Sequence, residues 1–348
     1  MKTIRVVTVI CWVVISAIFL GLIGWFFSGT VFGLRPAWID RNMPFRVGIG
    51  GTESLAGPFN VVGTYTANPD GITSIEIDWI SGEIIIRPHE GDQIEISELV
   101  QRNLHDNERL SMTISGDTLE IDFLSRTVAT RIGRMPAKRL EVLVPNALAQ
   151  NLISLEIRSV SGRVEISDMS INDIDVGTTS GNIYLSNIIS SDIEVSSTSG
   201  IINISDSSST SLDLDTTSGR INATGAFSRV DIDSTSGAVS LNNTTVQSVA
   251  NVDTTSGAIE LSGAFYSIET DTSSGGVSIR SIIVPSTLSV ETTSGTVSLT
   301  IPNEGSITVR HSSGSGRFNS DIPVVLQNRG AQFTFSTRSG NVNIFELR

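Results

Sequence analysis

Acidic residues recur at one position of a repeated sequence in the second half of the chain. A carboxylate directly precedes a pair of Ser or Thr residues in five consecutive repeats, at Asp215, Asp233, Asp253, Asp271 and Glu291. If the repeats stack as strands about 4.8 Å apart, these carboxylates repel one another and attract a cation such as Ca²⁺. The chain lacks the glycine-rich nonapeptide turns of calcium-binding solenoids, so the sequence favours a solvated acidic edge. We therefore expect no bound metal.

Basic residues gather in only one segment of this acidic chain. The chain has 23 Lys and Arg against 36 Asp and Glu, a formal net charge of −13, which argues against nucleic acid as a partner. An expected loop before the strand at Leu140 nevertheless carries Arg126, Arg131, Arg134, Lys138 and Arg139. This loop is a candidate for binding lipid headgroups or an anionic envelope polymer. The alternative is an ordinary solvated loop.

The sequence shows no arrangement of residues that is typical of catalysis. The three histidines, His89, His105 and His311, are far apart in the chain and show no metal-ligand spacing. There is no nucleophile motif, and the carboxylates are periodic rather than paired as in a glycosidase cleft. The sequence therefore predicts a protein that is not an enzyme and needs no cofactor. The alternative is a β-helix protein that binds or degrades polysaccharide.

A repeated Ser-Gly step organises the elements that would position these residues. Its serine recurs mostly at intervals of 18 to 20 residues, at Ser161, Ser180, Ser199, Ser218, Ser236, Ser256, Ser274, Ser294, Ser313 and Ser339. Two alternating apolar residues precede each step and two follow it, as strands with one buried face require. This period predicts an all-β fold, a single-stranded β-solenoid (β-helix) with rungs of about 19 residues.

The turn residues are expected to serve structure. Glycine opens the turn to positive φ, and the Ser and Thr hydroxyls can bond the exposed backbone of the bend. We assign this structural role to Gly162, Gly181, Gly200, Gly219, Gly237, Gly257, Gly275 and Gly295. Adjacent Thr-Thr pairs, such as Thr178 and Thr179, are expected to point to opposite faces.

A further apolar position lies midway through each rung. It is occupied by Met169, Ile188, Phe227, Val246, Phe265 and Ile283, which suggests a roughly triangular cross-section with one short side. The rungs become less regular near the C-terminus. There the aromatic residues Phe318, Phe333, Phe335 and Phe345 are expected to seal the end of the solenoid.

The chain is expected to have four parts. Residues 1–30 form a transmembrane signal anchor, because residues 6–27 are 22 uncharged residues in a row, long enough to cross a lipid bilayer. Lys2 and Arg5 place the N-terminus in the cytoplasm and the rest outside; a cleaved signal peptide is the alternative. Residues 31–71 are a linker, residues 72–150 a β-rich N-terminal cap, and residues 151–348 the regular solenoid with its C-terminal cap.

The combination of a membrane anchor, a strand ending in proline at 140–145 and repeated TTSG turns resembles a known family. It is similar to the bacterial putative-adhesin family of β-strand-repeat domains, a domain of unknown function, over about residues 72 to 348. The resemblance implies a β-solenoid at the cell envelope and supplies no active-site residues. We therefore expect an adhesin-like or scaffold module, tethered to the cell membrane, whose partner is an envelope protein or a glycan.

Overall fold

A computed structural model describes residues 59–348 of the 348-residue chain, apart from residues 103, 106–107, 124–136, 305–306 and 326–329. The expected anchor and most of the expected linker lie outside the described residues. Within the described part, no helix has the length and hydrophobicity that a membrane crossing requires. The helix described there is the single turn α2 (Asn146–Ala149).

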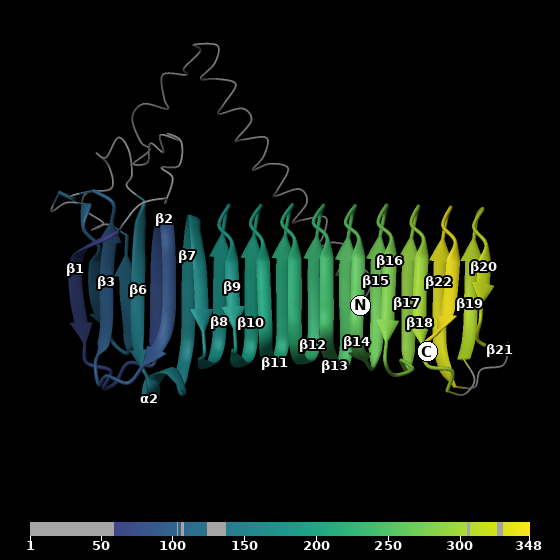
Figure 1. Cartoon of the computed structure of the whole chain (residues 1–348), viewed down its shortest axis with the longest axis horizontal. Coiled ribbons are helices and arrows are strands. Elements are labelled where there is room, and N and C mark those ends of the chain that lie inside the picture. Colours follow the sequence, from purple (N-terminus) through teal and green to yellow (C-terminus); the bar gives the residue numbers. More distant parts are fainter. Residues whose placement is uncertain (1–58, 103, 106–107, 124–136, 305–306, 326–329) are drawn as a thin grey trace, which may run out of the picture. The chain divides into compact units, whose positions relative to one another are not determined.

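Strands make up nearly all of the described regular structure, and they join in one sheet (Figure 1). The N-terminal strands are β1 (Asn60–Ala67), β2 (Ser74–His89), β3 (Ile94–Val100), β4 (Ser111–Ser115), β5 (Thr118–Asp122) and β6 (Lys138–Pro145). The regular rungs contain β7 (Leu152–Ser167), β8 (Ser170–Thr178), β9 (Ile183–Ser186), β10 (Ile189–Ser197), β11 (Ile202–Thr216), β12 (Ile221–Ser234), β13 (Val239–Thr254), β14 (Ile259–Phe265), β15 (Ser267–Thr272), β16 (Val277–Ser281), β17 (Thr287–Thr292) and β18 (Val297–Ile301). The C-terminal strands are β19 (Ile307–Ser313), β20 (Phe318–Ser320), β21 (Val324–Val325), β22 (Ala331–Thr337) and β23 (Val342–Glu346).

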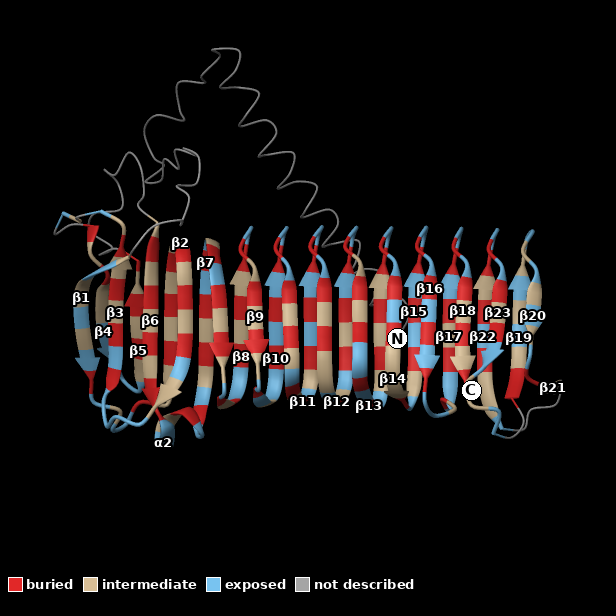
Figure 2. Cartoon of the chain, viewed as in Figure 1, coloured by how far each residue is buried: buried red, intermediate tan, exposed pale blue. Residues whose placement is uncertain are grey.

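The regular rungs stack in parallel and in register. Ile193 of β10, for example, pairs with Ile174 of β8 on one side and with Leu212 of β11 on the other. Buried and exposed residues alternate along each strand (Figure 2), so the apolar columns face the interior and the polar columns face solvent. The all-β solenoid predicted from the sequence period is therefore confirmed.

The mid-rung apolar column is buried as expected in five of its six members. Met169, Ile188, Phe227, Val246 and Phe265 are buried, but Ile283 is 41% exposed. In that rung Val284 packs against the core and Pro285 is buried, so the inward positions are displaced along the connection between β16 and β17. The prediction for Ile283 was wrong because the proline connection changes which residues face inward.

A second corner of the rungs depends on left-handed backbone and was not anticipated. Asp168, Asn187, Asp206 and Asn243 have φ between 49° and 61°. Asp and Asn tolerate this conformation better than other side-chain-bearing residues do. The Asn187 Nδ2 atom also donates to Asp168 Oδ1 of the preceding rung at 2.9 Å. A Ser precedes Asp168, Asn187 and Asp206, and this repeated step was the available sequence signal; Asn243 follows Asn242 instead.

The N-terminal end is closed by strands that leave the parallel pattern. Ser81 and Gly82 of β2 pair with Ser161 and Gly162 of β7, so this earlier Ser-Gly step forms one further rung. Beyond β2 lie β5 and β6, followed by the antiparallel strands β4, β3 and β1. Strands β4 and β5 form a hairpin whose turn contains Gly116, a glycine with positive φ.

The C-terminal end does not follow sequence order. Strand β22 pairs with β17 on one side and with β19 on the other (Figure 1), and β23 likewise lies between β18 and β20 (Figure 2). The last strands of the chain are therefore inserted beneath the rung that precedes them in sequence. Phe333 and Phe335 accordingly belong to the core, whereas Phe345 is 43% exposed. The prediction that four phenylalanines seal the C-terminal end was therefore wrong for Phe333, Phe335 and Phe345.

Because β22 is inserted between two rungs, we expect its core residues to contribute more to stability than those of the outermost rung. Phe335→Ala should lower the free energy of unfolding by about 3–5 kcal/mol, because the side chain is fully buried between two rungs. Phe318→Ala, on the outermost rung, should cost less because Phe318 is only partly buried. Chemical denaturation followed by circular dichroism checks both variants. The opposite ranking would contradict the inserted position of β22.

Candidate interaction surfaces

The repeated shape of each TTSG turn comes from contacts within and between rungs. The buried hydroxyl of Thr178 accepts a hydrogen bond from the Gly181 N–H at 3.0 Å. The same contact forms in the rungs of Ser159, Ser197, Thr216, Ser234, Thr254, Thr272 and Ser313. The neighbouring Thr179 is exposed, so the adjacent threonines do point to opposite faces.

Glycine is required in these turns for close backbone approach. A Cβ atom on Gly200 would lie 1.7 Å from the carbonyl oxygen of Gly181 in the preceding rung. The other assigned turn glycines are similarly crowded, except that a Cβ on Gly162 would lie 3.4 Å from the carbonyl oxygen of Gly82, and none of them has positive φ. The expected reason for glycine, a left-handed turn, was therefore wrong. The turns act as tightly stacked corners, and their outward hydroxyls form a regular edge.

The carboxylates predicted to stack do form a continuous column. Asp215 pairs with Asp233, and the pairing continues through Asp253 and Asp271 to Glu291. Two residues earlier in each rung, and hence on the same side of the sheet, lies a second column that contains Asp213, Asp231 and Glu269 and extends to Glu194 in the preceding strand β10. We call these nine residues the acidic face. Sequence analysis identified only the first column.

Few cations balance the acidic face. Arg229 lies 2.7 Å from Asp231, which also accepts a hydrogen bond from Asn251 Nδ2 at 2.7 Å. No ion pair to the column from Asp215 to Glu291 is found within the described residues. That part of the chain also contains no group of three His, Cys, Asp or Glu side chains that could hold a metal ion. The nine carboxylates of the acidic face thus form a strongly negative surface.

Crowding changes the protonation of these carboxylates. Partial desolvation, followed by neighbouring carboxylates, raises the pKa of Asp213 and of Asp215 to about 6 and that of Asp253 to about 7. The same causes raise the pKa values of Asp233 and Asp271. The side chains lie at the surface, so water screens part of the effect. These five aspartates of the acidic face therefore bind protons more readily than isolated aspartates do.

The basic segment is only partly described, and its two described residues are not in a loop. Lys138 and Arg139 begin strand β6, while Arg126, Arg131 and Arg134 lie outside the described residues. Arg139 Nε lies 2.6 Å from Glu83 Oε2, and its guanidinium stacks over the Phe59 ring at 4.3 Å. Arg139 is thus already engaged within the domain.

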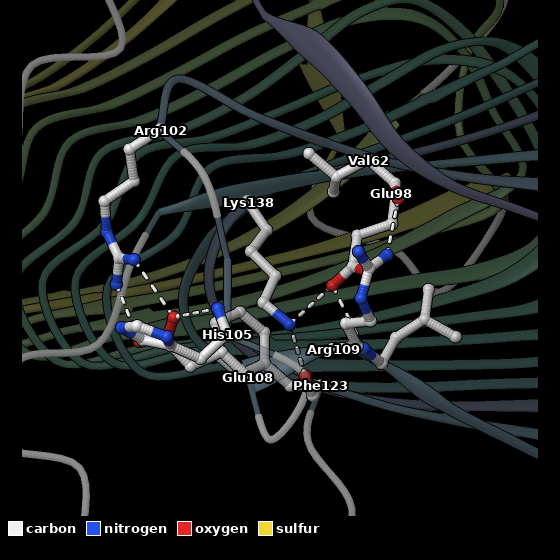
Figure 3. A network of polar contacts seen from close by, with 9 residues as sticks. Val62, Glu98, Arg102, His105, Glu108, Arg109, Phe123 and Lys138 are labelled. Atoms are coloured by element: carbon white, nitrogen blue, oxygen red, sulfur yellow. Dashed lines mark hydrogen bonds and ion pairs between the residues drawn. The ribbon is translucent and has the colours of Figure 1, made fainter.

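Lys138 belongs to a buried polar network in the N-terminal cap (Figure 3). Its side chain is fully buried, and Nζ donates to Glu98 Oε1 and to the carbonyl oxygen of Phe123, both at 2.6 Å. The ammonium group also lies 4.2 Å from the centre of the Phe123 ring. Burial lowers the pKa of Lys138, and the hydrogen bond to Glu98 opposes this effect. Lys138 therefore cannot contact a surface ligand in this fold.

The rest of the network fixes the loop between β3 and β4. Glu98 Oε1 also accepts the Leu110 N–H at 3.0 Å. Arg102 holds Glu108 through two hydrogen bonds of 2.8 and 3.0 Å, and the His105 N–H donates to Glu108 at 2.9 Å (Figure 3). The hydrogen bonds from Arg102 are the main reason that the pKa of Glu108 falls to about 2. The network is a structural feature that sequence analysis missed.

The three histidines do not come together. His89 ends β2 and His105 lies in the loop after β3, both in the N-terminal cap. His311 lies in β19, on the outermost C-terminal rung. Its ring is 5.3 Å from that of Phe318.

The buried ion pair makes a clear prediction. Lys138→Met should destabilise the protein by about 3–5 kcal/mol, because Glu98 would remain as an uncompensated buried charge. The double variant Lys138→Met/Glu98→Gln should recover part of this loss, since it removes the remaining charge and keeps an acceptor for Leu110. Denaturation midpoints measure both effects. A double variant less stable than the single one would disprove this account.

Comparison with known proteins places the chain among β-repeat proteins. The family model described as Toastrack DUF4097 matches residues 72–284 and 228–345. No protein with a curated description matches. Similar solved structures include a putative adhesin from Bacteroides fragilis (14% identity, 68% of this chain and 97% of that one, TM-score 0.40) and one from Parabacteroides distasonis (9%, 83% and 98%, 0.41). A putative lipid binding protein from Parabacteroides distasonis is also similar (15%, 84% and 98%, 0.33).

Proposed function

Because the chain belongs to the Toastrack DUF4097 family, we propose that it is an adhesin-like or scaffold module of the bacterial cell envelope. Its partner would be an envelope protein or a glycan. The supporting observation is the in-register stacking of the rungs, which repeats the same outward positions along the array. A partner with its own repeating structure can contact several rungs in the same way, and extended surfaces of this kind are the usual binding surfaces of solenoids.

The charge of the surface narrows the class of partner. The acidic face disfavours nucleic acid and anionic lipid and favours neutral or cationic groups. Lys138 and Arg139 do not offset this preference, because both are engaged in contacts within the N-terminal cap. A neutral glycan or a protein with a basic surface therefore fits the described solenoid better than an anionic polymer does.

In this proposal, residues 6–27 cross the lipid bilayer and carry the solenoid outside the cell. The support is their 22 uncharged residues together with Lys2 and Arg5 before them. The segment that follows, up to β1, would act as the tether. Such an arrangement presents the rungs to the envelope at a limited distance from the membrane.

The orientation can be tested by cysteine labelling in intact cells. In a Cys11→Ser background, Thr235→Cys should react with a membrane-impermeant maleimide, because Thr235 is an exposed turn residue of the solenoid. Lys2→Cys in the same background is the matched control and should react only after lysis. Labelling of both before lysis, or of neither, would contradict the proposed topology.

Photo-crosslinking tests the proposed binding role. Lys138 is buried and Lys2 is the only other lysine, so amine-reactive reagents would not report on the solenoid. A photoreactive amino acid is instead placed at Asp233 on the acidic face, at Thr198 on the turn edge or at the exposed Glu260 of β14. We expect light-dependent crosslinks to one envelope protein or glycan from one surface and not from the others.

Two outcomes would overturn the proposal. One is the absence of crosslinks from all three surfaces in native membranes. The other is turnover of envelope polysaccharides by the purified protein, which would favour a polysaccharide-degrading β-helix.

A further inference from the structure

The column of the acidic face from Asp215 to Glu291 places like charges at the closest spacing that a sheet allows. Asp233 and Asp253 each pair in register with a carboxylate on both sides. Adjacent strands lie about 4.8 Å apart, so full ionisation of the column is costly. Ser196 and Ser336 flank the column at its two ends, so the repulsion is confined to the central and later rungs.

We propose that the acidic face is a proton-dependent stability element of the solenoid. When all its carboxylates are ionised, their repulsion loosens the rungs from β11 to β17. When neighbouring carboxylates take up protons, the repulsion falls and a carboxyl group can donate a hydrogen bond to the next carboxylate. The stability of the rungs would then respond to the pH of the surroundings.

The charged groups that face the column support this assignment. From β10, β11 and β12 these are Glu194, Asp213, Asp231 and Arg229, and from β15 Glu269. Arg229 is paired with Asp231, and Arg158 of β7 pairs with Glu156 and Asp175, ahead of the column. The balance of charge on the column is therefore strongly negative.

The direction of the effect follows from the protonation of folded and unfolded chains. The pKa of Asp253 is raised to about 7 in the fold, against a value of 3.8 for an unperturbed aspartate. The folded state therefore binds protons more tightly than the unfolded state between these values, and stability increases as pH falls through this window. Glu108 has the opposite dependence, but its lowered pKa confines the loss of stability to more acidic conditions.

Thermal unfolding of the full chain at about pH 5 and about pH 8 tests the proposal. We expect a melting temperature several degrees higher at the lower pH. Asp233→Asn/Asp253→Asn should raise the melting temperature at the higher pH and reduce the difference between the two. Glu260→Gln is the control, because it removes a charge from a position flanked by Ser240 and Ser278 and should leave the difference unchanged. All these variants keep the three histidines, so any contribution of histidine to the pH dependence of the melting temperature is the same in each.

Three results would overturn the proposal. The first is an equal or lower melting temperature at the lower pH in the wild-type protein. The second is an equal effect of Glu260→Gln and Asp233→Asn/Asp253→Asn on the pH dependence. The third is a rise in melting temperature at the higher pH that is specific to CaCl₂ at matched ionic strength, which would assign the column to a metal ion.

Discussion

Parallel backbone hydrogen bonding between successive rungs imposes one constraint on the whole solenoid: each residue stacks on its counterpart in the next repeat. For Ile193 and its neighbours Ile174 and Leu212, this stacking buries apolar surface. For the turn hydroxyls it repeats a favourable contact with a glycine N–H. For the carboxylates of the acidic face it repeats a repulsion. The apolar columns and backbone ladders hold the charged columns together despite this cost.

The two ends of the array are built differently from the regular rungs, because a terminal rung has no partner on one side. At the N-terminus the antiparallel strands β3 and β4 and a buried ion pair replace the repeat. At the C-terminus the chain returns and inserts β22 and β23 beneath the rung of β19 and β20. Both ends therefore depend on contacts between segments that are distant in sequence.

This difference explains what the sequence could predict. Alternation of apolar residues and a fixed period are local properties, so the rungs and the first acidic column could be inferred from the amino-acid sequence alone. The insertion of β22 leaves no local signal, since the Ser-Gly step at Ser339 looks like one more repeat in order. The burial of Lys138 depends on Glu98 and Phe123, and no periodic pattern links the three.

Two predictions were mistaken in detail. The side chain of Ile283 was predicted to face the core, but a proline connection displaces the inward positions. The sequence located the glycine turns correctly. Glycine is required there, however, by the close approach of neighbouring rungs and not by the conformation of a single turn.

The inserted C-terminal rung also constrains how the protein is made. During synthesis a chain leaves the ribosome from its N-terminus, and a solenoid can in principle add rungs in that order. Residues 307–320 are synthesised before residues 331–346, yet their strands β19 and β20 rest on β22 and β23. The outermost rung therefore has no strand on its inner side to pair with until residues 331–346 have emerged. Assembly of this outermost rung must therefore follow synthesis of residues 331–346, whereas the rungs before it can form as they appear.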